Sequence, residues 1–195
     1  MRRVLVIDDH EPSRRNLIGV LAESGFEIAG EGTSGANAVE LSAATNPEVI
    51  LMAVGLSDLD GIRAARKVMQ ARPLPIVLLT SHCDAATIDR ATRAGVMGYL
   101  LKPLRESELT PAIELAVSRF QEFVTLQKGN EDLKRTLEAR KIIERAKGIL
   151  MDSQKMSEAT AFELIKRKSM DTRKPMAEIA QAIILAEEVS KRSIK

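Results

Sequence analysis

The feature that most constrains the fold is a regular alternation of short apolar runs with longer helical segments in the first part of the chain. The runs have the length of strands, and most are apolar on both faces; they cover residues 4–7, 26–29, 49–52, 76–79 and 99–101. Strands that are buried on both faces are typical of parallel sheets. Repeated strand–helix alternation therefore predicts an α/β domain with a five-stranded, doubly wound parallel sheet.

Residues that start and stop helices fall between these runs. Pro12 stands where the first turn of a helix tolerates proline, and Gly25 marks the end of the same helix. Asp84 is a good N-cap for a helix that stops at Gly95. These signals agree with the alternation that the apolar runs predict.

Beyond Pro103 the pattern changes to one long helix, expected over residues 107–137. Pro111 falls in its first turn, where the missing N–H does little harm. A short heptad seam is legible in this helix, and its core positions are Phe123, Leu126, Asn130, Leu133 and Leu137. An asparagine in such a seam can fix register and pairing.

The seam favours dimerisation through a short coiled coil. The alternative is an amphipathic linker that packs on its own chain, because barely two heptads are present and Gly129 lies inside them. The sequence leaves both possibilities open.

The last part of the chain, from about Arg140, has the apolar spacing of three helices. A break is expected at 152–156, after which Ser157 can cap the second helix. Another break is expected at 170–174, and Pro175 then starts the third helix. We therefore expect three parts: a domain over residues 1–115, a helical linker or coiled coil over 116–138, and an all-α three-helix domain over 139–195.

Charge is distributed unevenly along the 195 residues. The net charge is +2 overall, −3 over residues 1–115, zero over 116–138 and +5 over 139–195. An acidic front and a basic back predict different partners for the two ends, and a basic end favours a polyanion. The single cysteine, Cys83, excludes an internal disulfide. No apolar stretch has the length of a secretion signal or a membrane span, so we expect a cytoplasmic protein.

Polar residues close three of the predicted strands. Asp8 and Asp9 end the first, Thr80 ends the fourth and Lys102 ends the fifth, whereas Ala53 follows the third. Ligands bind at the carboxyl ends of strands in such sheets. A carboxylate pair can hold Mg²⁺, and a hydroxyl with an ammonium can hold phosphoryl oxygens. Each residue alone could be an ordinary strand-end residue, but their order on successive strands favours a phosphoryl-binding pocket.

With these residues, the segment 1–115 resembles the receiver domain of bacterial two-component response regulators, which has a flavodoxin-like fold. The resemblance implies that Asp8 and Asp9 bind Mg²⁺. It also implies that Thr80 is the switch hydroxyl, Lys102 the phosphate-pairing lysine and Tyr99 the aromatic residue that changes rotamer on activation. A partner histidine kinase would supply the phosphoryl group. The peptide before Pro103 is often cis in this family.

The position of the family's phosphate-accepting aspartate falls on Ala53, eight residues before Gly61. Phosphoryl transfer needs a nucleophilic carboxylate there, which alanine cannot supply. Two explanations stay open: a natural receiver that signals without phosphate, and an Asp→Ala change made to hold the unphosphorylated state. The otherwise complete pocket favours the second. In either case we expect weakened Mg²⁺ affinity and no stable aspartyl phosphate.

Basic residues gather on the helical end of the chain. One helix face is expected to hold Lys141, Arg145 and Gly148, at spacings of four and three, with Arg140 and Lys147 flanking it. Further candidates for phosphate contacts are Lys166, Arg167 and Arg173. Such contacts would give salt-dependent affinity for a nucleic acid. The alternative is a solvated face with cations that favour helix C-termini.

The aromatic content of this end separates two kinds of nucleic-acid recognition. Phe162 is its one aromatic residue and has the spacing of a core position. This argues against a platform on which single-stranded bases stack. Recognition of a folded RNA, or of DNA, by helix-borne cations fits better.

The segment 140–188 resembles the ANTAR domain, a three-helix RNA-binding module found behind receivers. The resemblance is carried by Arg140, the run 144–151, the stretches 158–159 and 161–162, and Met170, Arg173 and Ala180. It implies binding of paired RNA stem-loops in nascent transcripts and transcription antitermination. The coiled segment fits a homodimer that presents two such modules.

Two other functions stay open. One is a DNA-binding response regulator whose three helices act as a helix-turn-helix variant. The other is a pseudo-receiver that acts through protein interaction. No nucleophile–base pair is apparent outside the pocket, so we expect no enzymatic activity.

Overall fold

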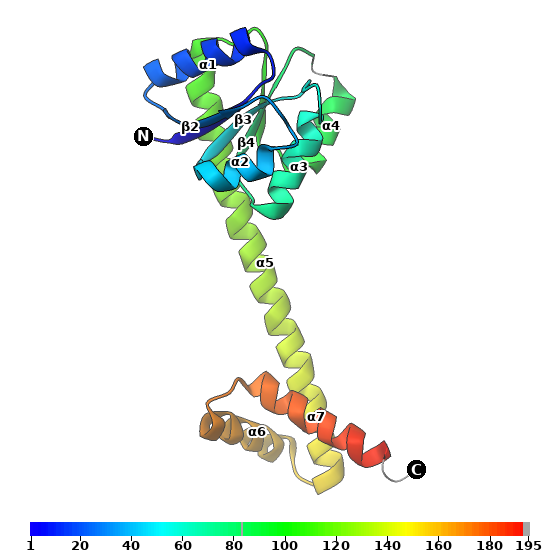
Figure 1. Ribbon diagram of the computed structural model, residues 1–195. Coiled ribbons are helices and arrows are strands. Elements are labelled where there is room, and N and C mark those ends of the chain that lie inside the picture. Colours follow the sequence, from blue (N-terminus) through cyan, green and yellow to red (C-terminus); the bar gives the residue numbers. More distant parts are fainter. Residues whose placement is uncertain (83, 193–195) are drawn as a thin grey trace. The chain divides into compact units, whose positions relative to one another are not determined.

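The computed structural model describes residues 1–82 and 84–192, with the backbone alone at 190–192 (Figure 1). Cys83 therefore lies outside the described residues. The chain folds as two units, Met1–Val124 and Thr125–Lys195.

The first unit is built on a five-stranded sheet in which every neighbouring pair is parallel. The strand order is β2-β1-β3-β4-β5. The strands are β1 (Arg3–Ile7), β2 (Glu27–Gly32), β3 (Val49–Ala53), β4 (Ile76–Thr80) and β5 (Gly98–Leu101). This confirms the doubly wound parallel sheet that the alternating sequence predicts.

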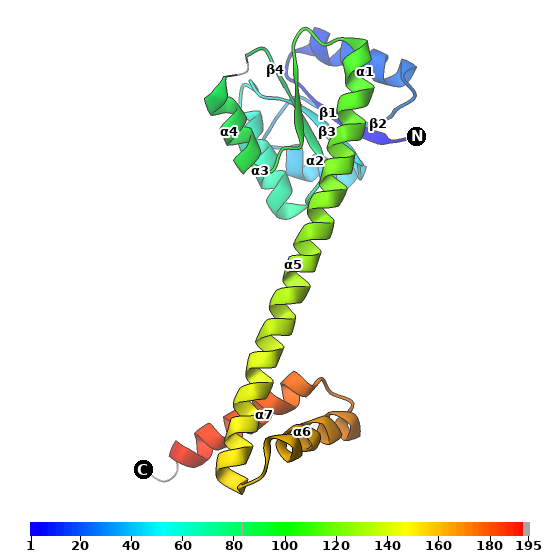
Figure 2. The same ribbon diagram turned by 180° about the vertical axis from the view of Figure 1, so that it is seen from behind.

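Helices cover both faces of this sheet, as Figure 2 shows from behind. They are α1 (Glu11–Glu23), α2 (Ala38–Thr45), α3 (Gly61–Ala71), α4 (Ala85–Arg93) and the first part of α5 (Glu106–Gln154). Alternate strand residues face opposite sides, which makes two separate cores. Leu5 and Ile50 lie in the core under α2, α3 and α4. Val6 and Leu51 lie in the core under α1 and α5.

Helix ends in this unit follow the local chemistry of the sequence. Pro12 lies in the first turn of α1, and Gly25 follows that helix with a φ of +83°. The Asp84 side chain caps α4 by accepting the Thr87 N–H at 2.7 Å. Gly95, with a φ of +82°, lies just beyond the end of that helix. These confirm the predicted start and stop signals.

The second strand is displaced from its predicted position. β2 begins at Glu27 rather than at Phe26 and continues to Gly32. Phe26 is buried in the core under α1 and α5. The pairing of β1 with β2 also shifts register between Val4 and Leu5. Apolar periodicity reports burial rather than strand geometry. It therefore included Phe26 in the predicted strand, although this buried residue precedes β2.

Helix α5 is continuous from Glu106 to Gln154. The sequence predicted two helices here, one ending near residue 137 and one starting near 140, and that division is wrong. Neither a proline nor a capping glycine lies between them, so nothing stops the first helix. Gly129 lies within the helix and does not interrupt it.

The second unit is helical. The last part of α5 packs with α6 (Glu158–Thr172) and α7 (Met176–Arg192) around a small core of Ala146, Leu150, Ala161, Ile165, Ala180 and Ile184. Ser157 caps α6 as predicted, by accepting the Thr160 N–H at 3.2 Å. In the parts of the chain that the structure describes, we find no helix that combines the length and the apolarity needed to cross a membrane.

Candidate functional site

The carboxyl ends of the strands meet at one hollow in the first unit. The hollow is lined by Asp8, Asp9, His10, Ser13, Ala53, Gly55, Leu79, Thr80, Ser81 and Lys102. Asp8 and Asp9 directly follow β1, whereas Ala53 and Thr80 are the last residues of β3 and β4. Lys102 follows β5. The five residues that the sequence placed at strand ends therefore come together around one space.

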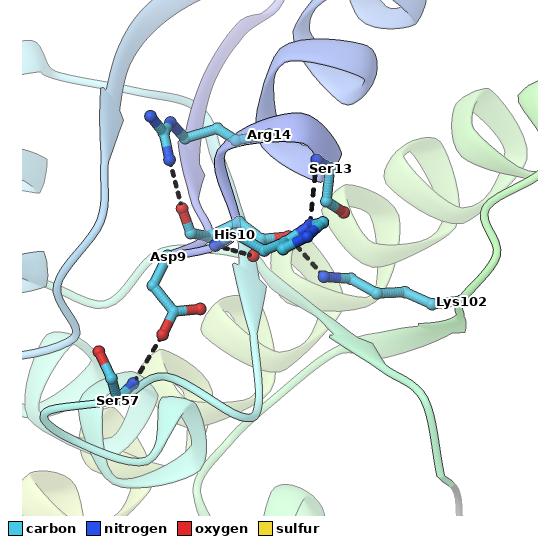
Figure 3. Close-up of polar contacts among 7 residues, drawn as sticks. Asp9, His10, Ser13, Arg14, Ser57 and Lys102 are labelled. Carbon is cyan, nitrogen blue, oxygen red and sulfur yellow. Dashed lines mark hydrogen bonds and ion pairs between the residues drawn. The ribbon is translucent and has the colours of Figure 1, made fainter.

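Asp8 is the most enclosed polar residue of this hollow. Its side chain is 1 % exposed, and Lys102 Nζ lies 2.5 Å from Asp8 Oδ2. The other carboxylate oxygen accepts the His10 N–H at 3.1 Å. Arg14 donates to the Asp8 carbonyl oxygen at 2.8 Å (Figure 3). The buried carboxylate is therefore compensated by one ammonium and accepts one backbone N–H, while Arg14 holds the main chain of the same residue.

Asp9 points to a different part of the site. Its Oδ2 accepts the backbone N–H of Ser57 at 2.9 Å, which ties the end of β1 to the loop between β3 and α3 (Figure 3). Two carboxylates beside an open hollow suit Mg²⁺, which commonly takes one or two carboxylates and keeps several waters. Among the described residues, however, there is no group of three or more metal-binding side chains. Asp8 and Asp9 thus fit a cation site with few protein ligands.

Thr80 and Tyr99 lie in different surroundings. Thr80 Oγ1 donates to the His82 carbonyl oxygen at 2.6 Å and accepts the His82 N–H at 3.2 Å. Tyr99 is 48 % exposed and lines a neighbouring hollow with Lys102 and Pro103. The peptide before Pro103 is cis, as the resemblance to receivers implied. Thr80 therefore faces the pocket, whereas Tyr99 stands outside it.

Two further residues shape the loop after Ala53. Asp58 accepts the Ser34 hydroxyl at 2.5 Å and the N–H groups of Gly35 and Ala36 at 3.0 Å each. The Ser34 hydrogen bond, followed by backbone N–H donors, holds the pKa of Asp58 well below its ordinary value. The sequence marked the turn that contains Asp58, but nothing in it identified the partner loop.

Gly61 lies against the backbone of β3. A side-chain carbon at this position would lie 2.0 Å from the Ala53 carbonyl oxygen. Any larger residue would push the loop away from the strand end, so glycine is required by this close approach. The glycine eight residues after Ala53 thus has a steric reason.

In the second unit, Lys147 is buried rather than presented to solvent. Its side chain is 8 % exposed, and its Nζ lies 2.8 Å from Glu144 and 2.7 Å from Glu158. Hydrogen bonds to Glu144 and then to Glu158 raise the pKa of Lys147. The same contact with Lys147 lowers the pKa of Glu158. Lys147 therefore joins α5 to the start of α6, a position that sequence spacing could not reveal.

The neighbouring candidates on α5 are more accessible. Arg145 pairs with Glu188 of α7 at 3.1 Å, and its side chain is 63 % exposed. Lys141 pairs with Glu138 at 2.7 Å on the same helix. Arg140 is exposed, and Gly148 has open space where a side chain would project.

A second basic group lies at the end of α6 and in the turn that follows. Its members Lys166, Arg167, Lys168, Arg173 and Lys174 are all exposed. Arg173 adopts a left-handed backbone with a φ of +54°. The Ser169 hydroxyl donates to the Lys174 carbonyl oxygen at 2.5 Å and fixes the turn. These five cations are therefore exposed at the end of α6 and in the turn after it.

Phe162 of α6 does not occupy the core position that its spacing predicted. Its side chain is 39 % exposed, so that prediction is wrong. Ala161 and Ile165, four residues apart, form the buried face of the helix, and Phe162 lies at the edge of that face. One exposed ring does not make a platform on which successive bases stack.

Comparison with known families agrees with both units. Residues 4–114 match the response regulator receiver domain, and residues 131–184 match the ANTAR domain. The chain is 43 % identical over 183 residues to the transcriptional regulatory protein PdtaR of Mycobacterium tuberculosis, covering 94 % of this chain and 89 % of that protein. It is 37 % identical over 118 residues to LiaR of Bacillus subtilis, covering 60 % of this chain and 56 % of that protein.

Solved structures resemble the first unit. The receiver domain of a modulated diguanylate cyclase from Desulfovibrio desulfuricans has a TM-score of 0.58 at 30 % identity, covering 62 % of this chain and 97 % of that chain. The receiver domain of NarL from Mycobacterium tuberculosis has a TM-score of 0.57 at 31 % identity, covering 60 % and 96 %. The chain belongs to the two-component response regulators that join a receiver domain to an ANTAR domain.

Proposed function

We propose that this response regulator binds RNA stem-loops in nascent transcripts and acts by transcription antitermination, in the cytoplasm. The observation that carries the proposal is the ANTAR match at residues 131–184 on a helical unit with an exposed basic turn. Cations on helices and turns suit the phosphates of a folded RNA, and no base-stacking aromatic platform is needed.

The RNA-binding residues are proposed to be Arg140, Lys141, Arg145, Gly148, Lys166, Arg167 and Arg173. Arg167 and Arg173 are exposed near the end of α6, where guanidinium groups can take phosphates in a bidentate way. Lys147, another sequence candidate, has its ammonium engaged by two carboxylates. A direct contact from it to RNA would require that ammonium to leave both partners, so its binding role is proposed to be indirect.

In the receiver, Ala53 is proposed to occupy the phosphoacceptor position. It ends β3 inside the hollow that also contains Asp8, Thr80 and Lys102. A cognate histidine kinase would phosphorylate a form with aspartate at this position, but the methyl group of Ala53 has no nucleophilic oxygen. Mg²⁺ would be held by Asp8 and Asp9, more weakly than with a third carboxylate.

The proposed working form is a homodimer joined through the exposed apolar seam of α5. Leu126, Leu133 and Leu137 are 74 %, 67 % and 58 % exposed. Pairing two chains would present two RNA-binding units at once, and linked sites gain affinity without any new contact. For such a dimer we propose a division of the chain into a receiver (1–115), a linker (116–138) and an RNA-binding domain (139–195).

Gel shifts with the full chain test the RNA proposal. We expect binding to an RNA with two stem-loops and much weaker binding to duplex DNA of equal length and charge. Arg167→Ala should weaken RNA binding and flatten its dependence on salt, because a phosphate contact releases counterions. Preference for the duplex DNA would support a DNA-binding output instead.

Intact-mass measurement tests the assignment of Ala53. After treatment with acetyl phosphate and Mg²⁺, we expect no covalent phosphate on this chain and one on an Ala53→Asp variant. A phosphate adduct on the Ala53 protein would place the acceptor elsewhere and overturn the assignment.

A further inference from the structure

The hollow that Ala53 lines holds charges of both signs. Asp8 and Asp9 bring two negative charges, and Lys102 brings one positive charge. The Lys102 ammonium pairs with Asp8 at 2.5 Å, while Ala53 offers only a methyl group. The ammonium is thus engaged on the side of β1 and has no anionic partner on β3 at residue 53.

We propose that this hollow binds a small monocarboxylate, such as formate, together with a divalent cation. The carboxylate would lie beside Ala53, in the space between the strand end and Lys102, and the cation would be held by Asp8 and Asp9. The inference rests on the proposed cation site of the receiver, and it adds a ligand class that covalent phosphorylation does not involve.

The groups that line the hollow favour an anionic ligand beside Ala53. Ala53 is 3 % exposed and is one of the lining residues. The Lys102 ammonium can donate to a carboxylate, whereas the Thr80 hydroxyl could do so only after leaving the His82 carbonyl oxygen to which it donates. A buried anion needs such donors, because an uncompensated charge is costly in a confined site.

The Lys102–Asp8 ion pair makes the two ligands depend on each other. Without a cation, Asp8 neutralises Lys102, and the remaining charge of Asp9 repels an incoming anion. When a divalent cation takes Asp8, the Lys102 ammonium is released and the pocket gains net positive charge. A carboxylate that then binds Lys102 restores neutrality, so each ligand should raise the affinity of the other by the same factor.

The test measures Mn²⁺ binding to the full chain in formate and in chloride at equal ionic strength. Electron paramagnetic resonance of the free ion detects the binding. We expect formate to tighten Mn²⁺ binding about five-fold or more, which is the lower end of ordinary coupling between two sites. The effect should saturate with formate, because it comes from occupancy of one site.

Two variants locate the effect. Ala53→Val fills the hollow with apolar atoms and should bind Mn²⁺ without any response to formate. Ala53→Asp supplies the carboxylate covalently and should bind Mn²⁺ more tightly, again without a formate response. Equal Mn²⁺ affinity of the original chain in both salts would overturn the inference, as would an undiminished formate effect in Ala53→Val.

The outcomes also separate this inference from the function proposed above. If Ala53→Asp binds Mn²⁺ and formate does not change the Mn²⁺ affinity of the original chain, the proposed carboxylate site is wrong and the proposed cation site stands. If neither protein binds Mn²⁺, the assignment of Asp8 and Asp9 as cation ligands fails, and this inference fails with it.

Discussion

At the scale of single residues, the same residue type has different roles in the two units. Lys102 lines an open hollow and pairs with one buried carboxylate. Lys147 is itself buried and pairs with two carboxylates that face solvent. The first arrangement leaves space for a ligand, whereas the second closes a contact between two helices. Burial and partner geometry, rather than charge, separate a lysine that borders an open hollow from one that joins two helices.

Lys147→Ala should lower the thermal unfolding midpoint of the helical unit. The change removes the ammonium that joins Glu144 of α5 to Glu158 of α6, and it leaves two carboxylates facing each other. Lys166→Ala is the matched control, because Lys166 is 49 % exposed and pairs with Glu163 at 3.3 Å on the same helix. Circular dichroism of both variants measures the difference, and equal midpoints would argue against the structural role of Lys147.

RNA binding gives a second readout for the same pair of variants. Lys147→Ala should weaken RNA binding with little change in the salt dependence, because no phosphate contact is lost. Lys166→Ala should reduce the salt dependence if the exposed turn meets phosphates. A marked loss of salt dependence in Lys147→Ala would show that its ammonium reaches the RNA.

Asp58→Ala should loosen the loop before α2. The Asp58 carboxylate accepts the N–H groups of Gly35 and Ala36, so amide hydrogen exchange at these two residues should become faster. Lowering the pH should also loosen this loop. The pKa of Asp58 in the folded protein is depressed below its ordinary 3.8, so its contribution to stability is complete above that value and is lost as the pH falls below it. Unchanged exchange at both amides would contradict this role.

At the scale of elements, the strands and their order were predictable because buried parallel strands are short, apolar and regularly spaced. The same regularity placed Asp8, Thr80 and Lys102 at strand ends, and the topology then brought them together. The contact between Lys147 and Glu158 was not predictable, because it depends on how α6 turns back onto α5. The single helix α5 was missed because residue patterns change at 137–140 although the backbone does not.

Helix α5 carries the proposed dimer seam, and Leu133→Ser tests it. Leu133 is 67 % exposed, so replacing it should cost little in folding and should weaken self-association. Lys128→Ser is the control, since Lys128 lies on the outer face of the same heptad pattern. Sedimentation equilibrium measures the dimer dissociation constant of both variants. Equal dissociation constants for Leu133→Ser and Lys128→Ser would exclude this seam.

At the scale of the whole molecule, an acidic receiver and a basic helical unit share one long helix. Residues of α5 enter the core under the sheet and also the core of the helical unit. The proposed function links the two: a change in the receiver pocket would alter pairing along α5 and so the affinity for RNA. In the proposed account, Ala53 closes the covalent route into that pocket, while Asp8, Asp9, Thr80 and Lys102 still line it.

The most direct measurement is the affinity for a two-stem-loop RNA before and after treatment with acetyl phosphate and Mg²⁺. It should be made on this chain and on Ala53→Asp under identical salt. We predict that both proteins bind the RNA and that treatment tightens binding only for Ala53→Asp. Tighter binding by the treated Ala53 protein, or no RNA binding by either protein, would contradict the proposed function.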